Sequence, residues 1–161
     1  MPAKTETATF AAGCFWGVEE LFRKLPGVKG TRVGYTGGKT KKPSYEMVCT
    51  GITGHAEALE IVFDPKKVSY AKLLEMFFAN HNPTTPNRQG WDIGTQYRSA
   101  VFYNSEAQKK EAEKAKENAG REGRWAGKKI VTEIAPAGVF WEAEEYHQKY
   151  LFKKGEASCH V

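Results

Sequence analysis

One cysteine near the start of the chain has the sequence surroundings of a reactive thiol. Cys14 stands in Gly13-Cys14-Phe15-Trp16-Gly17, between a strand-like segment and residues with helical spacing. At the start of a helix, unpaired backbone N–H groups and the helix dipole favour the thiolate, which is the nucleophilic form of cysteine. The two glycines permit a tight turn and the close approach of another molecule. These surroundings fit a catalytic cysteine and a structural one equally well.

The other two cysteines differ from Cys14 in their surroundings. Cys49 lies between Val48 and Thr50, in an alternation of apolar and polar residues that is typical of a buried and inert thiol. Cys159 lies in a polar tail, residues 153–161, which we expect to be mobile. A mobile thiol can swing in to attack an oxidised cysteine, so Cys159 could be a resolving thiol. The alternative is that Cys159 is an incidental cysteine near the end of the chain.

The cysteine and histidine inventory limits the chemistry. Three cysteines are an odd number in a chain of this size, which argues against a structural disulfide framework and favours a reducing compartment. The three cysteines and four histidines show no spacing typical of metal ligands. We therefore predict neither a metal nor another cofactor.

Length and charge indicate a single soluble domain. The 161 residues can bury one core, so we expect one catalytic domain over residues 1–161, with the tail at its end. Residues 1–9 lack the apolar region of a signal peptide, and no later stretch is apolar enough to span a membrane. The net charge of +5 comes from scattered lysines and arginines without a nucleic-acid-reading module. These features predict a cytoplasmic protein, a monomer, with neither nucleic acid nor membrane as a partner.

Hydrophobic periodicity predicts alternating strands and helices. One helix follows Gly13 and ends before Pro26-Gly27, and two others begin at the capping residues Ser69 and Ser105. A last helix is expected over residues 141–152, and the loop 83–98 is longer than a mere connection requires. The predicted strands are 5–11, 28–35, 56–63, 99–103 and 130–135. This order predicts an α+β fold, a mixed sheet with helices over one face and a ferredoxin-like βαββαβ core.

The segment around Cys14 resembles the signature of the A-type peptide methionine sulfoxide reductases. Further blocks resemble those of the family in the same order, and together they cover most of the chain from Phe10 to Leu151. The resemblance implies an α/β sandwich with a mixed central sheet. The blocks are Gly34-Tyr35-Thr36-Gly37-Gly38, Pro43-Ser44-Tyr45, Thr53-Gly54-His55-Ala56-Glu57, His81-Asn82-Pro83-Thr84, residues 89–99 and residues 140–148.

The implied activity is the reduction of methionine (S)-sulfoxide, protein-bound or free, to methionine. The resemblance makes Cys14 the nucleophile that attacks the sulfoxide sulfur and becomes a sulfenic acid, and it makes Glu57 the acid. A sulfoxide oxygen leaves poorly unless it is protonated, so a thiol and a carboxylic acid suffice. Aromatic neighbours would remove the Glu57 carboxyl from water and so disfavour its charged form.

Other residues receive substrate-binding roles from the same resemblance. Phe15 and Trp16 wall a pocket for the methyl group, Tyr45 and Tyr97 hydrogen-bond the sulfoxide oxygen, and Asp92 orders a water there. Without the family blocks, packing or turn roles fit these residues better. The resemblance gives no catalytic role to His55 and His147, which we expect to be structural.

Recycling of the sulfenic acid is assigned to the tail. Cys159 would form a disulfide with Cys14 that thioredoxin reduces, although the family varies in this region and Cys49 is the alternative. Two other functions remain open. The chain could be another thiol redox enzyme, such as a peroxidase, or a binder of oxidised methionine without chemistry.

Overall fold

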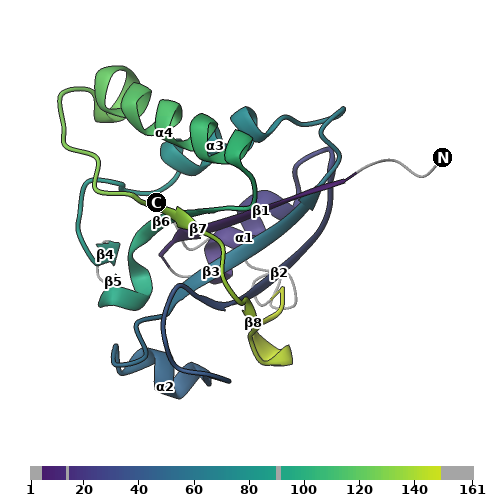
Figure 1. The fold of residues 1–161 in the computed structure, drawn as a ribbon, viewed down its shortest axis with the longest axis vertical. Coiled ribbons are helices and arrows are strands. Elements are labelled where there is room, and N and C mark those ends of the chain that lie inside the picture. The colour runs from purple at the N-terminus through teal and green to yellow at the C-terminus, as the bar shows by residue number, and fades with distance from the viewer. Residues whose placement is uncertain (1–4, 14, 90–91, 150–161) are drawn as a thin grey trace.

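The computed structural model describes residues 5–13, 15–89 and 92–149, which form a mixed six-stranded sheet with helices packed against it (Figure 1). The strand order is β7-β6-β1-β3-β2-β8. A separate two-stranded ribbon, β4-β5, lies in the long loop before β6. The strands are β1 (Glu6–Ala12), β2 (Val28–Thr36), β3 (Ala56–Phe63), β4 (Arg88–Gln89), β5 (Asp92–Ile93), β6 (Ser99–Tyr103), β7 (Glu133–Pro136) and β8 (Trp141–Glu142). The α-helices are α1 (Phe15–Arg23), α2 (Tyr45–Cys49), α3 (Tyr70–Ala79) and α4 (Glu106–Arg121), and the 3-10 helices are η1 (Thr95–Tyr97), η2 (Gly123–Trp125) and η3 (Glu145–His147).

The inner four strands have the predicted ferredoxin-like arrangement. Strands β6, β1, β3 and β2 are neighbours in that order and every adjacent pair is antiparallel. Helix α1 connects β1 to β2, and α3 connects β3 to β6. After α4, β7 joins the edge beside β6 in parallel, and β8 adds to the opposite edge antiparallel to β2. The predicted α+β class and βαββαβ core are therefore confirmed.

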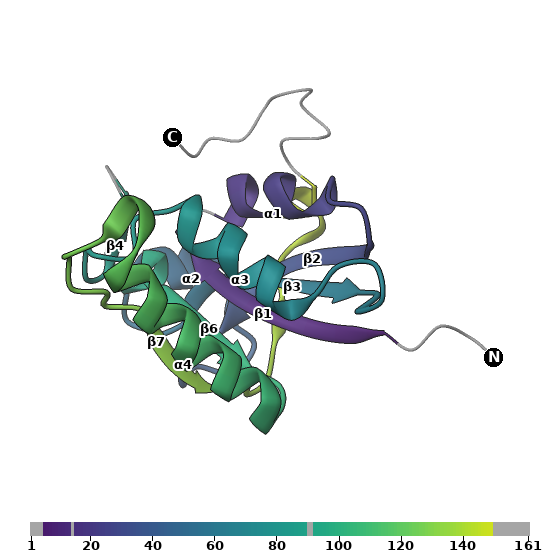
Figure 2. The same ribbon diagram turned by 90° about the horizontal axis from the view of Figure 1, so that it is seen from above.

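The two faces of the sheet bury different kinds of side chain. On one face Phe10, Leu59 and Ile61 are fully buried in a core that also takes side chains from α1, α3 and α4. Helices α3 and α4 lie side by side over this face (Figure 2). The opposite face carries alanines, such as Ala58, beside Phe102, and Ala135, Ala137 and Phe140 cover it. Within the described residues, helices thus pack against one face, as predicted, and the segment that follows β7 packs against the other.

Helix starts follow local capping chemistry. The Ser69 side chain accepts a hydrogen bond from Lys72 N (3.0 Å), and the Ser105 side chain accepts one from Gln108 N (3.2 Å). Each bond satisfies a backbone donor that the first helical turn leaves free. Gly13 has φ +94°, a left-handed conformation that lets the chain turn between β1 and α1.

The predicted helix over 141–152 is wrong in its described part, residues 141–149. Residues 141–142 form β8, and η3 is a single 3-10 turn. Contacts with β2 override the helical pattern: Ala143 N donates to Val33 O (2.9 Å), and the Gln148 amide accepts from Val33 N and donates to Val33 O. These bonds hold residues 143–148 in an irregular segment, which we call the strap, along the edge of β2.

Helix α2 is absent from the sequence prediction and corrects the interpretation of Cys49. Ser44 caps α2 by accepting from Met47 N (3.2 Å), and the helix ends with Cys49. Cys49 is therefore an exposed helical residue, and the prediction that it is buried is wrong. Strand β7 begins three residues later than predicted, because Val131 N bonds to Pro83 O outside the sheet. Within the described residues no helix is long and apolar enough to cross a membrane.

Candidate active site

Glu57 is a carboxyl group buried between the sheet and the start of α1. It lies on the helix-covered face of β3, is 2% exposed and stands opposite Tyr35 of β2 in the strand register. Its Oε1 accepts a hydrogen bond from Phe15 N at 3.4 Å. That nitrogen belongs to the peptide bond between Phe15 and Cys14, so the Glu57 carboxyl contacts the backbone next to the predicted nucleophile.

An aromatic cluster stands beside Glu57. The ring of Phe15 lies 5.7 Å from that of Tyr35, 6.5 Å from that of Tyr45 and 5.3 Å from that of His147. Trp16 stacks near Tyr45 at 6.4 Å. The fold thus brings together four predicted site residues, Phe15, Trp16, Tyr45 and Glu57, from α1, α2 and β3.

His147 completes this cluster, although we expected it from the sequence to be structural. Its ring lies 4.3 Å from that of Tyr45, and Trp16 Nε1 donates to its Nδ1 at 2.9 Å. Burial lowers the pKa of His147, against the opposing charge of Glu144. Because Nδ1 accepts from Trp16, the neutral ring carries its proton on Nε2, which is buried and has no hydrogen-bond partner among the described residues. Its place in the family block 140–148 was the one signal that could have marked it.

Glu144 of the strap is a second carboxyl group at the site. Its Oε1 accepts from the Tyr35 hydroxyl (2.9 Å) and its Oε2 from Tyr45 N (3.0 Å). Burial alone would raise the pKa of Glu144, but hydrogen bonds from the Tyr45 backbone, its own backbone and the Tyr35 hydroxyl outweigh it and lower this pKa. Burial and the bond to Glu144 raise the pKa of Tyr35. Sequence reasoning did not find Glu144.

Cys49 faces the site from the end of α2. The Cys49 thiol lies one helical turn from Tyr45, close enough for each side chain to shift the pKa of the other. Although the residue as a whole is exposed, partial burial of the thiol raises the pKa of Cys49, and the charges of Glu57 and Glu144 act in the same direction. A raised pKa leaves less thiolate at neutral pH, so the structure keeps Cys49 weakly reactive.

The long loop brings Tyr97 close to the site, whereas Asp92 lies at its exposed end. Gln96 Nε2 donates to Cys49 O (3.3 Å), which ties η1 to α2. The charge of an ionised Tyr97 contributes to the raised pKa of Tyr45, so the two phenols are near each other. Asp92 is exposed in β5, opposite Gln89. The predicted residues Cys14 and Cys159 lie outside the described residues.

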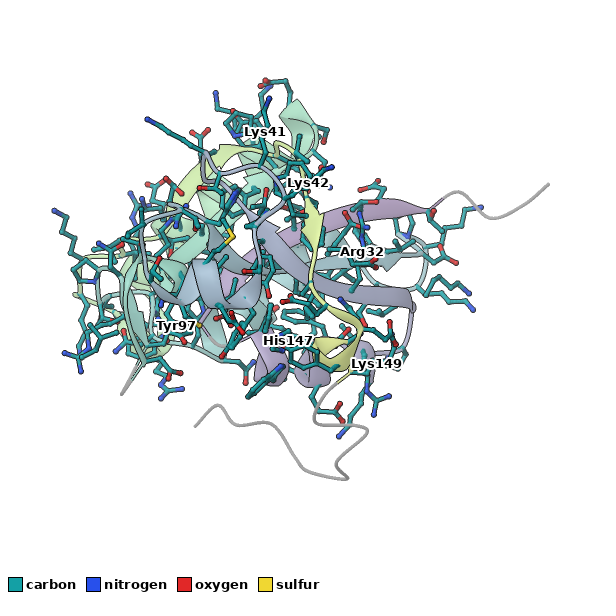
Figure 3. All side chains as sticks on the ribbon, turned by 90° about the horizontal axis from the view of Figure 1, so that it is seen from below. Arg32, Lys41, Lys42, Tyr97, His147 and Lys149 are labelled. Carbon is teal, nitrogen blue, oxygen red and sulfur yellow. The ribbon has the colours of Figure 1, made fainter. Side chains whose placement is uncertain are left out.

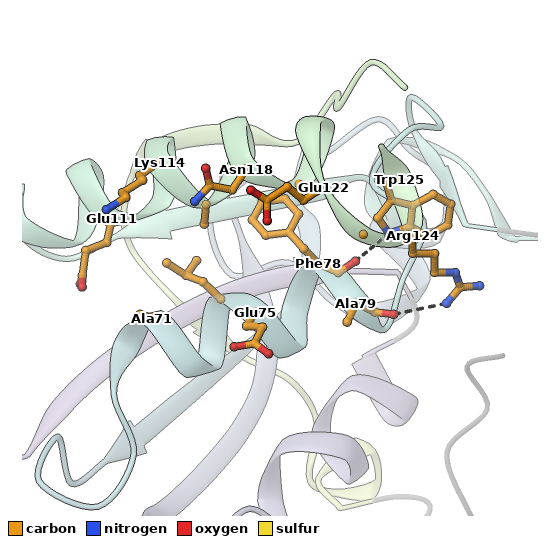
Figure 4. A pocket seen from close by; sticks show the side chains of 14 residues that line it. Ala71, Glu75, Phe78, Ala79, Glu111, Lys114, Asn118, Glu122, Arg124 and Trp125 are labelled. Carbon is orange, nitrogen blue, oxygen red and sulfur yellow. Dashed lines mark hydrogen bonds between the residues drawn. The ribbon is translucent and has the colours of Figure 1, made fainter. Parts of the chain in front are cut away.

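Two exposed lysines and a groove lie away from this cluster. Figure 3 shows Tyr97 and His147 on one side of the molecule and Lys41 and Lys42 toward the opposite side. A groove of about 570 Å³ runs between α3 and α4 over Phe78 and Trp125, and no predicted site residue lines it (Figure 4). Among the described residues no group of three His, Cys, Asp or Glu side chains could hold a metal ion.

Fold and site together define a class: an α+β enzyme with a buried carboxyl group and an aromatic cluster at the start of a helix. The family model described as peptide methionine sulfoxide reductase matches residues 6–161. The chain therefore belongs to the peptide methionine sulfoxide reductase family, oxidoreductases that reduce methionine sulfoxide. This confirms the resemblance drawn from the sequence.

Individual relatives agree with the family model. The chain is 54% identical over 159 residues to peptide methionine sulfoxide reductase MsrA of Methanothermobacter thermautotrophicus, covering 99% of this chain and 94% of that protein. It is similar to the reduced form of Mxr1 from Saccharomyces cerevisiae, with TM-score 0.90, 43% identity, and coverage of 100% and 93% of the two chains. It is also similar to Mxr1 in complex with Trx2, with TM-score 0.67, 32% identity, and coverage of 100% and 91%.

Proposed function

We propose that the chain reduces methionine (S)-sulfoxide, protein-bound or free, with Cys14 as nucleophile and Glu57 as acid. The observation that carries this assignment is the bond from Phe15 N to Glu57 Oε1, which joins the buried carboxyl to the peptide that follows Cys14. Removing a carboxyl group from water disfavours its charged form, so a 2% exposed Glu57 suits proton donation.

In the proposed reaction, the Cys14 sulfur attacks the sulfoxide sulfur while Glu57 protonates the sulfoxide oxygen. An S–S bond forms, and the S–O bond breaks as the oxygen leaves as water, which carries the protons of Glu57 and of the Cys14 thiol. A water molecule then attacks the Cys14 sulfur, the S–S bond breaks, and one proton returns to Glu57. Two electrons have passed from Cys14 to the substrate, and methionine and a Cys14 sulfenic acid result. Phe15 and Trp16 hold the methyl group by apolar contact. Tyr45 and Tyr97 donate hydrogen bonds to the oxygen, and Asp92 orders a water beside it. The raised pKa of Tyr45 keeps its hydroxyl protonated as a donor.

Regeneration is proposed to use the tail. Cys159 condenses with the Cys14 sulfenic acid and releases water, and the dithiol of a thioredoxin then reduces the Cys14–Cys159 disulfide. The similarity to Mxr1, which has been seen in complex with Trx2, supports thioredoxin as the reductant. We further propose a monomer with one catalytic domain over residues 1–161, working in the cytoplasm on oxidised proteins and free methionine sulfoxide.

Substrate consumption separates this function from its rivals. We expect purified protein with dithiothreitol to reduce a methyl sulfoxide of S configuration, and Cys14→Ser to be inactive. Consumption of peroxide with untouched sulfoxide would indicate a peroxidase instead, and binding without turnover would indicate a binding protein.

The tail assignment has its own test. Cys159→Ser should still reduce one equivalent of sulfoxide but fail to turn over with thioredoxin. Mass spectrometry of the oxidised wild type should find the Cys14–Cys159 disulfide. Full thioredoxin-driven turnover in the variant would exclude Cys159 as the resolving thiol.

A further inference from the structure

Glu144 connects two segments that are remote in the sequence and adjacent at the site. Its two oxygens accept from the Tyr35 hydroxyl on β2 and from the backbone nitrogen of Tyr45, the first residue of α2. A carboxylate that accepts two such bonds fixes the distance between its donors. Glu144 therefore sets the position of α2 relative to the sheet.

Helix α2 depends on such contacts because it cannot hold itself in place. It has five residues, far fewer than an isolated helix needs for stability in water. At its other end the side-chain contacts are longer: Gln96 Nε2 to Cys49 O is 3.3 Å and Thr95 Oγ1 to Gly51 O is 3.4 Å. The 3.0 Å bond to Glu144 thus anchors the end that carries Tyr45.

The carboxylate is itself rigidly held and charged. Ala143, directly before Glu144, donates its N–H to Val33 O, and Gln148 Nε2 donates to both Val33 O and Ala143 O. The lowered pKa of Glu144 keeps it ionised at neutral pH. Hydrogen bonds to an ionised acceptor are about twice as strong as neutral ones. A fixed, charged acceptor is what accurate placement of a short helix requires.

We infer that Glu144 is a positioning residue for sulfoxide reduction, which holds the Tyr45 hydroxyl where it meets the sulfoxide oxygen. The inference rests on the proposed function and deepens it, because it assigns a role to a strap residue outside the reacting groups. Glu144 acts through Tyr45, so its contribution exists only while the Tyr45 hydroxyl exists. A merely structural carboxylate would contribute equally with and without that hydroxyl.

The experiment is a double-mutant cycle on kcat and KM, with a methyl sulfoxide substrate and dithiothreitol as reductant. We expect Glu144→Ala to lower kcat about tenfold with a smaller change in KM. In a Tyr45→Phe background the same substitution should cost less than about threefold, because coupled residues are not additive. Glu144→Gln should recover most of the activity, since its amide oxygen can accept from Tyr45 N and its NH₂ can donate to the Tyr35 oxygen. The control is Glu142→Ala, an exposed carboxylate of the neighbouring β8.

The outcomes separate this inference from the proposed function. Thermal unfolding identifies any variant that does not fold. If Glu144→Ala folds, Glu144→Gln should recover most of the kcat that Glu144→Ala loses. If Glu144→Ala does not fold, Glu144→Gln carries the test, and we expect it to lose only a modest part of the wild-type kcat. Equal losses from Glu144→Ala in the two backgrounds, or a folded Glu144→Ala with wild-type kcat, would overturn the positioning role alone. Wild-type protein that leaves the sulfoxide untouched would overturn the proposed function and this inference with it.

Discussion

Two buried histidines, His81 and His147, sit in opposite kinds of surroundings. At His81 the ring contacts Phe77 O through Nδ1 and Ser99 Oγ through Nε2 (2.7 Å), and Ser99 in turn bonds to Thr132 Oγ1 (2.7 Å). At His147, Nδ1 accepts from Trp16, whereas the buried Nε2 has no hydrogen-bond partner in the part of the chain that the structure describes. Both rings are at most 3% exposed. The two rings are therefore equally buried, and they differ only in whether both nitrogen atoms have hydrogen-bond partners among the described residues.

This difference shows how the fold divides stability from chemistry. A buried polar group without a partner costs free energy, so a fold normally pairs such groups. The His81 cluster obeys this rule and closes on itself between α3, β6 and the segment before β7. The cluster around His147, Glu57 and Tyr45 departs from this rule, because the buried His147 Nε2 has no hydrogen-bond partner among the described residues. We expect substitutions in the first cluster to change stability and substitutions in the second to change activity.

The largest effect is expected for Glu57→Gln. The amide keeps the shape of the side chain and an acceptor for Phe15 N, but it cannot supply a proton. We expect kcat/KM for methyl sulfoxide reduction to fall by about 100-fold or more, with a nearly unchanged melting temperature. A variant that keeps a third of the wild-type activity would show that the acid is another group.

The corresponding substitution in the His81 cluster is His81→Phe. It removes both ring nitrogens and leaves Ser99 and the carbonyl of Phe77 without those partners. We expect a loss of about 1–3 kcal/mol in the free energy of unfolding, measured by urea denaturation. Below the melting transition kcat should stay within about twofold of wild type. A large loss of kcat in folded protein would contradict the division between the clusters.

Strands and caps could be predicted because local rules decide them. Residues 56–63 and 99–103 were predicted as strands with their observed bounds, and Ser69 and Ser105 cap helices as expected. The strap could not be predicted, because its conformation depends on bonds to Val33 more than one hundred residues earlier. Helix α2 has five residues, too few to show a helical period, so the alternation of apolar and polar residues around Cys49 indicates a burial that the structure does not have.

Site residues divide in the same way. The family blocks supplied Phe15, Trp16, Tyr45 and Glu57, and the structure brings these four together. The family blocks could not assign a role to Glu144 or to the buried Nε2 of His147, because both roles depend on where the strap crosses the edge of β2. Tertiary contacts of this kind leave no local pattern in the sequence.

A smaller effect concerns the pH dependence of stability. Burial holds the pKa of His147 below its ordinary value of 6.5. At a pH between the pKa of His147 in the folded protein and its ordinary value, the unfolded chain binds a proton that the folded chain does not. The free energy of unfolding must therefore fall as the pH drops below about 6.5, by at most about 1.4 kcal/mol per pH unit from this group.

His147→Phe tests this dependence and keeps an aromatic ring in the cluster. Urea denaturation from pH 7.5 to pH 5 should show a shallower decline for the variant than for wild type. Groups that do not interact with His147 contribute equally to both proteins, and Glu144, which does, has a lowered pKa that keeps it ionised in this range, so the difference between the two slopes reports His147. Identical slopes would mean that His147 titrates alike in the folded and unfolded states.

The smallest effect is expected for Cys49→Ser. Cys49 lies beside Tyr45 at the edge of the cluster around His147, but its raised pKa leaves little thiolate to attack a sulfenic acid. Serine keeps a small polar side chain beside Tyr45. Turnover with thioredoxin should therefore stay within about twofold of wild type. If turnover were lost while one equivalent of sulfoxide was still reduced, Cys49 of α2, and not Cys159, would be the thiol that reacts with the Cys14 sulfenic acid.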